Sequence, residues 1–540
     1  MSRTCLWRQV FAVIACCFSA TGPLPAAAED LTLLSQPGPW SGISNLIGYD
    51  HRVWFANSVK YVNHNSADIY SYDPVGGETR YEAHLLSQDA GHPLVADGLL
   101  YWPFEDPRFT VGLGEYMVTD GEAWRWHTLP DGQAFHVHAM ASLNGTLYAA
   151  TSAWRAGLQT STDGGVTWRI IHDHPTAEQR VTRITALTTF KDTLYAGLTD
   201  RNTDGTRLLR LDGETLIPVD GWPDGRRVTV LAVHDGWLYA NNLGETESTL
   251  WRTDGTVVEP LLAMSGVAVR ALASGPDALW AVSAGRSRGR LWRSEDGVTW
   301  SIAQRFAGAA PMDVAVIGGD VYVGTAGPDG RGGLWGPPSP SNLPEPNNRS
   351  FEAEPNELTD AEATGLLATL DQTLADPEAY QGYGSGLRKI LWPLSHHRSP
   401  EIGAAVSERL GGPFPNLSLQ LFNDNFIVTA TDMARWALLR VIALNGHGAV
   451  PLSLIGEPWD APQNDPEKYM EPVPAAAWTV ARIGQSDDAT LQALLDRLDT
   501  PDDPAWLVGD IVGALTALTG ERFGYDVVAW RDWWADQDRR

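Results

Sequence analysis

The feature that most constrains the fold of this chain is a short apolar segment with a central aromatic residue, which recurs along residues 52–324. Successive aromatic residues are separated by 47, 47, 47, 44, 41 and 42 positions. A period in this range is typical of architectures that repeat one supersecondary unit. The seven aromatic residues are Trp54, Tyr101, Tyr148, Tyr195, Tyr239, Trp280 and Tyr322.

An aspartate follows each of the first six copies, and in five cases a glycine comes next. Asp-Gly between two apolar segments is a hairpin turn signal. A further apolar segment precedes each aromatic copy, as in 184–190 and 229–233. Each unit therefore reads as four strands, which is the make-up of one β-propeller blade. The aspartates are Asp73, Asp120, Asp163, Asp212, Asp254 and Asp296.

The seventh unit indicates how the ring closes. It supplies strands at 313–318, 321–324 and near 333–335, and Pro337 then ends the pattern. Segment 31–38 precedes the first blade and has no hairpin partner of its own. We expect it to be the missing fourth strand, because that pairing removes two open sheet edges. The sequence thus predicts an all-β seven-bladed propeller over residues 29–341.

One hairpin carries a more specific pattern, Ser161-x-Asp163-x-Gly165-x-Thr167-Trp168. It resembles the Asp-box, or BNR repeat, of sialidase-like propellers. Residues 293–300 are a degenerate copy, with Glu295 where the aspartate is expected. The resemblance covers about residues 31–341. It implies that the box is a structural turn on the blade rim, away from the active centre.

The character of the chain changes after the propeller. Residues 342–356 are rich in Pro, Asn and Glu without periodicity, which is typical of a linker. Residues 357–540 are expected to form an all-α domain of short helices without strands, stacked in pairs as in HEAT or armadillo repeats. Its last segment, 518–534, resembles the end of bacterial HEAT-like domains. Expected helices begin at Thr359 (a capping box with Glu362), Ser399, Asp432 and Asp488, and the last pair covers 505–518 and 526–534.

Charge limits the classes of partner. The formal net charge is −27, and no cluster of Lys and Arg is present, which excludes nucleic acid. Residues 350–540 hold 29 acidic and 13 basic residues. This excess serves solubility, or alternatively it docks a basic partner.

Residues 1–28 read as a secretory signal peptide. Arg3 and Arg8 precede and flank an apolar run over 10–18, and Ala26–Ala28 offers a cleavage site. The run is too short for a transmembrane span. We therefore expect export by the Sec route to the periplasm or outside the cell. The alternative is a lipoprotein anchored at Cys16. All three cysteines lie in this segment, so the mature chain has no thiol chemistry.

Binding sites of propellers usually lie where inner-strand entrances and the loops between second and third strands converge. His136 and His138 share one strand face, and His92 belongs to the neighbouring blade. These three imidazoles are candidates for ligand or catalytic contact, for a transition metal, or for a structural role in bonding loops. The ligand-binding candidates together are His64, His92, Arg108, His136, His138, Trp154, Arg155 and Arg183.

A second metal candidate is the polar loop with Asp200, Asn202 and Asp204, which matches the first half of a calcium loop. Leu211 stands where an EF-hand needs its bidentate glutamate, so an EF-hand is excluded. A looser calcium site and a polar turn are the remaining interpretations.

Three functions follow from these patterns. The first is a binding or scaffold protein that presents a glycan or peptide site on the propeller face. The second is a glycoside hydrolase or polysaccharide lyase, with Glu105 or Asp106 as acid or base. Arg108, Arg155 and Arg183 would then clamp an anion. The chain departs from sialidases in having seven blades and no Arg-Ile-Pro segment before the first. The third is a metal-binding redox propeller.

Overall fold

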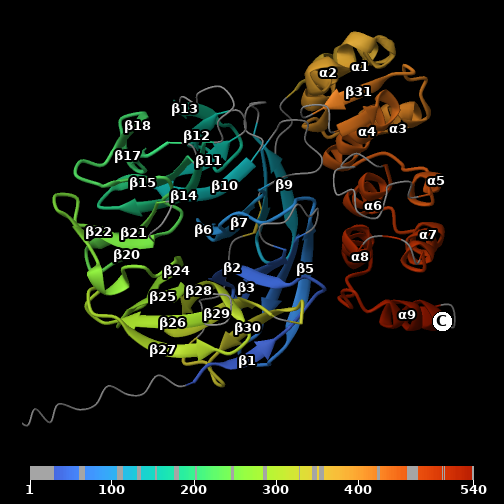
Figure 1. The fold of residues 1–540 in the computed structure, drawn as a ribbon. Coiled ribbons are helices and arrows are strands. Elements are labelled where there is room, and N and C mark those ends of the chain that lie inside the picture. The colour runs from blue at the N-terminus through green and yellow to red at the C-terminus, as the bar shows by residue number, and fades with distance from the viewer. Residues whose placement is uncertain are drawn as a thin grey trace, which may run out of the picture. The chain divides into compact units, whose positions relative to one another are not determined.

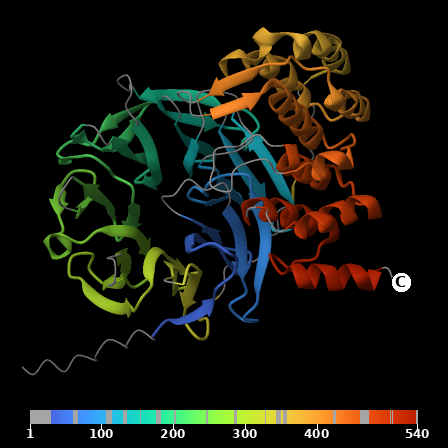
Figure 2. The same cartoon turned by 45° about the vertical axis from the view of Figure 1, so that its right-hand side comes forward.

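The protein was analysed as a computed structural model. The structure describes residues 30–537 apart from 60–66, 106–113, 130–135, 153–154, 175–181, 201–202, 245–247, 284–288, 328, 343–349, 352–357, 422–425, 459–471, 501–502 and 504. The predicted fold class is confirmed. Seven antiparallel four-stranded blades follow one another around a ring, and a helical region comes after them (Figures 1 and 2). The first and seventh blades are joined into one eight-stranded sheet.

Each repeat of the sequence forms one blade, and the recurring aromatic segment is its second strand. Blade one comprises β2 (Gly42–Tyr49), β3 (Arg52–Ser58), β4 (Ala67–Tyr72) and β5 (Thr79–Leu85). Blade two comprises β6 (Leu94–Ala96), β7 (Leu99–Pro103), β8 (Glu115–Thr119) and β9 (Trp124–Thr128). Blade three comprises β10 (His136–Leu143), β11 (Thr146–Ser152), β12 (Ala156–Ser161) and β13 (Arg169–His174). Blade four comprises β14 (Thr182–Phe190), β15 (Thr193–Asp200), β17 (Leu208–Asp212) and β18 (Thr215–Pro218). Blade five comprises β20 (Leu231–His234), β21 (Trp237–Leu243), β22 (Ser248–Thr253) and β23 (Val258–Pro260). Blade six comprises β24 (Val269–Ser274), β25 (Leu279–Ser283), β26 (Gly289–Ser294) and β27 (Ser301–Phe306). A short extra pair, β16 (Gly205–Thr206) and β19 (Asp224–Gly225), accompanies blade four.

Blade seven is built from both ends of the propeller sequence. Its strands β28 (Ala310–Ile317), β29 (Asp320–Ala326) and β30 (Gly332–Gly336) are continued by β1 (Thr32–Ser35), which pairs antiparallel with β30. Leu31 adds a second tie, since its N–H and C=O both bond the amide of Gln304 in blade six, at 2.8 and 3.1 Å. The N-terminal strand thus covers the edge that β30 would otherwise leave open.

The Asp-Gly hairpins are fixed by their own side chains. In blade three, Asp163 accepts hydrogen bonds from the backbone N–H of Thr167 at 2.9 Å and from the Ser161 hydroxyl at 2.7 Å. In blade six, Asp296 takes the equivalent position and accepts from the N–H of Val298 at 2.8 Å. The expectation that Glu295 fills this position is therefore wrong, because this hairpin is one residue shorter than the first.

Two of these hairpins also contact the preceding blade. The Tyr116 hydroxyl, in blade two, donates to the carbonyl of Gly165 in blade three at 3.0 Å. A Cβ on Gly165 would lie 2.5 Å from that hydroxyl, and a Cβ on Gly297 would lie 1.8 Å from the hydroxyl of Tyr239. Both glycines have positive φ, at 96° and 68°. Glycine is needed here for its backbone conformation and for the tyrosine that packs on it.

The C-terminal region is helical, and most of its starts follow the expected capping residues. Thr359 and Glu362 form the predicted capping box. Ser399 caps its helix as expected, whereas Thr429 and Asp487 cap the helices expected at Asp432 and Asp488. The helices are α1 (Asp360–Ala375), α2 (Gln381–Ser395), α3 (Pro400–Ser407), α4 (Ala430–Asn445), α5 (Leu452–Ile455), α6 (Pro472–Ile483), α7 (Asp488–Leu498), α8 (Ala505–Thr519) and α9 (Val527–Gln537). None in the described part is long and apolar enough to cross a membrane.

The expectation of helices without strands is wrong at one place. Strands β31 (Ser418–Leu421) and β32 (Phe426–Thr429) form an antiparallel pair, visible as the two orange arrows in Figure 2. Leu419 and Val428 lie opposite each other and are buried. Residues 418–421 alternate polar and apolar, and residues 426–428 are a short apolar run of β-branched and aromatic residues; both are strand patterns that the helical interpretation overlooked.

The helical region packs on blades one and two. One buried apolar cluster includes Tyr81 from β5 together with Val512 and Leu515 from α8. The rings of Trp126 and Trp478 meet edge to face with centroids 5.4 Å apart. The contact between the two regions is therefore apolar at its core.

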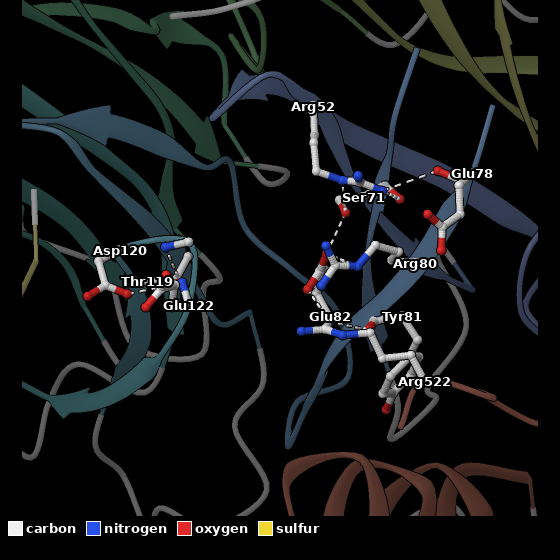
Figure 3. Close-up of polar contacts among 11 residues, drawn as sticks. Arg52, Ser71, Glu78, Arg80, Tyr81, Glu82, Thr119, Asp120, Glu122 and Arg522 are labelled. Atoms are coloured by element: carbon white, nitrogen blue, oxygen red, sulfur yellow. Dashed lines mark hydrogen bonds and ion pairs between the residues drawn. The ribbon is translucent and has the colours of Figure 1, made fainter. Parts of the chain in front are cut away.

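Arginines of the helical region add polar contacts to the same interface. Arg482 donates to the carbonyl of Trp124 at 2.9 Å. Arg522 donates to the carbonyl of Tyr81 at 2.8 Å and also contacts the carboxylate of Glu82. Figure 3 shows this contact continuing across blade one, where Ser71 joins Glu82 to Arg52. Two of the basic residues of this acidic region, Arg482 and Arg522, thus contact the propeller.

Candidate functional site

Four inner strands of the propeller share one irregularity near their entrances. The register shifts by one residue between Val137 and Ala139, between 184 and 186, between 269 and 271, and between 311 and 313. A β-bulge of this kind redirects a side chain and is common beside functional sites. The bulged residues are His138, Thr185, Arg270 and Met312.

Two of these bulged residues reach the next blade. The Thr185 hydroxyl donates to the carbonyl of Val228 in blade five at 3.3 Å. The Arg270 guanidinium lies 2.9 Å from the sulfur of Met312 in blade seven. These two bulges therefore join blade four to blade five and blade six to blade seven.

Two residues before the bulge, His136 and Arg183 occupy matching positions on adjacent blades. His136 pairs with Ser152, and Arg183 pairs with Thr199. Ser152 and Thr199 each lie five residues after the first core leucine in the second strand of their own blade. Residues at matching register in neighbouring blades lie at the same end of the ring. This places both side chains at the entrance that the sequence analysis singles out.

Glu105, at the end of the second strand of blade two, connects these two side chains. Its backbone carbonyl contacts Nδ1 of His136, and since a carbonyl only accepts, Nδ1 carries the proton. Its carboxylate lies 3.6 Å from Nη1 of Arg183. We call Glu105, His136, His138 and Arg183 the Glu105 cluster.

The two histidines of this cluster are stacked and buried. Their ring centroids are 5.3 Å apart with an interplanar angle of 16°. Nε2 of His138 also lies 2.9 Å from the Ser152 hydroxyl. Burial lowers the pKa of His138 well below 6.5, and the nearby His136, Arg183 and His92 lower it further. His138 is therefore a neutral imidazole at physiological pH.

The carboxylate and guanidinium of the cluster are partly open to solvent. The side chains of Arg183 and Glu105 are 30% and 31% exposed. Their separation exceeds the 2.7–2.9 Å of a strong charge-assisted hydrogen bond. The guanidinium thus keeps donor capacity for another acceptor. The cluster places a carboxylate, a guanidinium and the neutral imidazole of His138 within one small area.

The remaining candidates are not all part of this cluster. Arg155 forms an ion pair at 2.5 Å with Asp173 on β13, the outermost strand of blade three, and its side chain is 57% exposed. The backbone N–H of His92 donates to the carbonyl of His138 at 2.9 Å, so His92 borders the cluster. His64, Asp106, Arg108 and Trp154 lie outside the described residues.

The metal candidates do not form a ligand set in the described part of the chain. There, no three His, Asp or Glu side chains are arranged to hold a metal ion, and this includes His92, His136 and His138. In the loop proposed for calcium, the two described carboxylates face different cations. Asp200 lies 3.7 Å from Arg207, Asp204 lies 3.0 Å from Arg226, and Asn202 is outside the described residues.

The sequence analysis missed Ser152, Thr185 and Arg270, although a signal was present. His138, Thr185, Arg270 and Met312 each lie ten residues before the central aromatic residue of their repeat. Aligning the repeats on that residue identifies the bulged position in these four blades. Residue type alone does not indicate the bulged position, because these four side chains differ in size, charge and polarity.

Comparison with known proteins gives only structural matches. No protein-family model matches the chain, and no curated protein matches it. YCF48 from Cyanidioschyzon merolae aligns with 12% identity and a TM-score of 0.42, covering 58% of this chain and 99% of that one. The WD40 domain of Neurospora crassa Pan2 aligns with 12% identity and a TM-score of 0.42, covering 59% and 98%. A structure of YCF48 bound to D1 peptide aligns with 14% identity and a TM-score of 0.41, covering 59% and 99%.

Proposed function

We propose that this chain is an exported binding protein whose propeller holds a carboxylate-bearing glycan or peptide at the Glu105 cluster. The observation that carries this proposal is the loose Glu105–Arg183 pair. Its 3.6 Å separation and partial exposure leave the guanidinium able to receive a ligand carboxylate. The neutral His138 beside it adds hydrogen bonding without adding charge.

The hairpin geometry supports assigning the propeller to the Asp-box type. Ser161, Asp163 and Thr167 bond to one another as a self-contained turn. The turn follows β12, the third strand of its blade, whereas the cluster lies at the starts of the inner strands. The box therefore serves the fold, and the ligand site is formed by other residues.

Binding fits the cluster better than glycan cleavage does. A glycosidase keeps one carboxyl protonated as an acid beside a second carboxylate. Glu105 instead lies 3.6 Å from the guanidinium of Arg183 in the described part of the cluster. The hydrolase, the lyase and the redox propeller stay predictions of the sequence, as do export and docking of a basic partner on the helical region.

The test compares Arg183→Gln with Arg155→Gln in the mature protein, using oligouronates and acidic peptides as probes and their neutral counterparts as references. Arg155 is the matched control, because it is an arginine of the same face that pairs outward with Asp173. Loss of one charge-assisted contact, about 1.5–3 kcal/mol, weakens calorimetric binding about 10- to 150-fold. We expect this loss for Arg183→Gln alone. Equal loss in both variants, or binding of neutral probes only, would contradict the proposal.

A further inference from the structure

Three ionisable side chains meet inside the interface between blade one and the helical region. Asp68 lies on β4, His84 on β5 and Asp510 on α8, and all three are buried. Nδ1 of His84 lies 2.7 Å from the carboxylate of Asp68, and Nε2 lies 3.1 Å from that of Asp510. The imidazole therefore connects the propeller to the helical region through both of its nitrogens.

This geometry specifies the protonation state of His84. A carboxylate only accepts hydrogen bonds, so each ring nitrogen must donate one. Only the imidazolium has two N–H donors. The docked arrangement thus holds a proton that a neutral histidine lacks. The other oxygen of Asp68 accepts from Nε1 of Trp40 at 2.9 Å and from the Tyr525 hydroxyl at 2.8 Å, so that carboxylate is well satisfied.

Helix α8 is shaped to approach this histidine closely. Gly509 and Gly513 are four residues apart and share one face of the helix. A Cβ on Gly509 would lie 2.7 Å from Cε1 of His84, and a Cβ on Gly513 would lie 2.9 Å from its Cβ. Larger residues at either position would separate the helix from β5. Shape and hydrogen bonding therefore select the same docked position.

We propose that Asp68, His84 and Asp510 form a proton-dependent contact that holds the helical region against blade one and weakens when His84 loses its proton. The docked state binds this proton, and separation of the two surfaces releases it into solvent. Docking of the helical region then depends on pH, and so does any surface that the two regions form together.

The phenols that lie near His84 do not titrate in the same range. Burial and the nearby Asp68 raise the pKa of Tyr70, Tyr81 and Tyr525 well above 10, so these phenols stay neutral. Glu82 and Arg522 form an adjacent ion pair of opposite charges. His84 is therefore the group whose charge changes near neutral pH.

The direction of the pH dependence follows from the pKa of His84. Burial alone lowers this pKa, but Asp510 and Asp68 together outweigh burial and raise it above 6.5. The contribution to docking is complete below about pH 6.5, the value of a free histidine. It is lost as the pH rises through the raised value, because the docked state no longer holds the extra proton.

The experiment measures hydrogen exchange of β5 and α8 in the mature full-length protein at pH 6 and pH 9, corrected for intrinsic exchange rates. We expect protection of both elements to fall at pH 9 by about tenfold for each unit by which the pKa is raised. His84→Gln should remove this pH dependence. His234→Gln is the matched control, since His234 is also buried and bonds Ser274 at 2.9 Å, far from the interface.

A second arm avoids substitution of a buried histidine. Asp510→Asn keeps His84 and Asp68 together but removes one carboxylate, so it should reduce the pH effect without abolishing it. Equal corrected protection of the wild-type protein at pH 6 and pH 9 would overturn the proposal. So would an undiminished pH effect in His84→Gln or Asp510→Asn. A failed ligand-binding test of the Glu105 cluster leaves this result unaffected, because the two sites share no residue.

Discussion

The guanidinium of Arg440, on α4, contacts the carboxylate of Glu115, on β8, and both side chains are buried. Arg440 also donates to the Thr128 hydroxyl, and its guanidinium carbon lies 5.6 Å above the ring of Trp392. A charge pair without water around it is costly to break from one side only. The stability of both the propeller and the helical region therefore depends on this pair remaining intact.

Removing Arg440 alone should destabilise the protein severely. Arg440→Met leaves the Glu115 carboxylate buried without its cation, at a cost of about 3–5 kcal/mol. The double variant Arg440→Met, Glu115→Gln should recover most of this loss, because no uncompensated charge remains. Urea unfolding of both variants gives the values. A double variant as unstable as the single one would show that the pair acts through packing only.

Gly297→Ala should be far more damaging than Gly255→Ala. Both glycines have positive φ, at 68° and 91°, so both changes carry backbone strain. Only the new Cβ at 297 meets a neighbour, the Tyr239 hydroxyl, whereas nothing lies within 4 Å at 255. We expect an added cost of about 1–3 kcal/mol for Gly297→Ala in thermal or urea unfolding. Adding Tyr239→Phe should restore part of that difference, and no restoration would point to strain alone.

Deleting residues 31–36 should destabilise the whole propeller. The deletion removes β1, exposes the edge of β30 and breaks the bonds to Gln304. A loss of several kcal/mol lowers Tm by about 10 °C at about 2–4 °C per kcal/mol. A synthetic peptide of residues 30–37 should raise Tm again by adding the missing strand, while a scrambled peptide should not. An unchanged Tm after deletion would contradict the role of β1.

His138 should make the protein less stable in mild acid. Its pKa is lowered well below 6.5 in the folded protein, mainly by burial, so it stays neutral there. As the pH falls below about 6.5, this histidine becomes protonated in the unfolded chain but stays neutral in the folded chain. The free energy of unfolding therefore falls by about 1.4 kcal/mol per pH unit.

The matching variant is His138→Gln, which should lose less stability than the wild type between pH 7.5 and pH 5.5. His447→Gln, at an exposed position, is the control. Urea unfolding at the two pH values measures both. An unchanged pH dependence in His138→Gln would mean that His138 is protonated in the folded protein.

The propeller could be predicted because its determinants repeat. Tyr101, Tyr239 and Tyr322 occupy the same buried position in three different blades. The same sequence pattern occurs in all seven repeats, so each copy supports the same structural interpretation. The interface with the helical region has no such repetition. His84, Asp510 and Arg440 look like ordinary surface residues in the sequence, and only the packing of α4 and α8 shows that they are buried.

The location of the Glu105 cluster could be predicted from the sequence better than the residues that form it. Position along the repeat brings His136 and Arg183 to the same end of the ring. It does not determine the direction of a long side chain, and Arg155 turned outward to Asp173 for this reason. Strand bulges such as the one at His138 depend on backbone geometry that residue type does not reveal.

The pairing of β1 with β30 also sets an order in time. About 300 residues separate these strands, and at about 5–20 residues per second their synthesis takes about 15 to 60 s. Until then the first strand to be made has no partner to pair with. The helices that cover β5 are made later still. Blade seven, which combines β1 with β28, β29 and β30, therefore cannot be completed before β30 has been made.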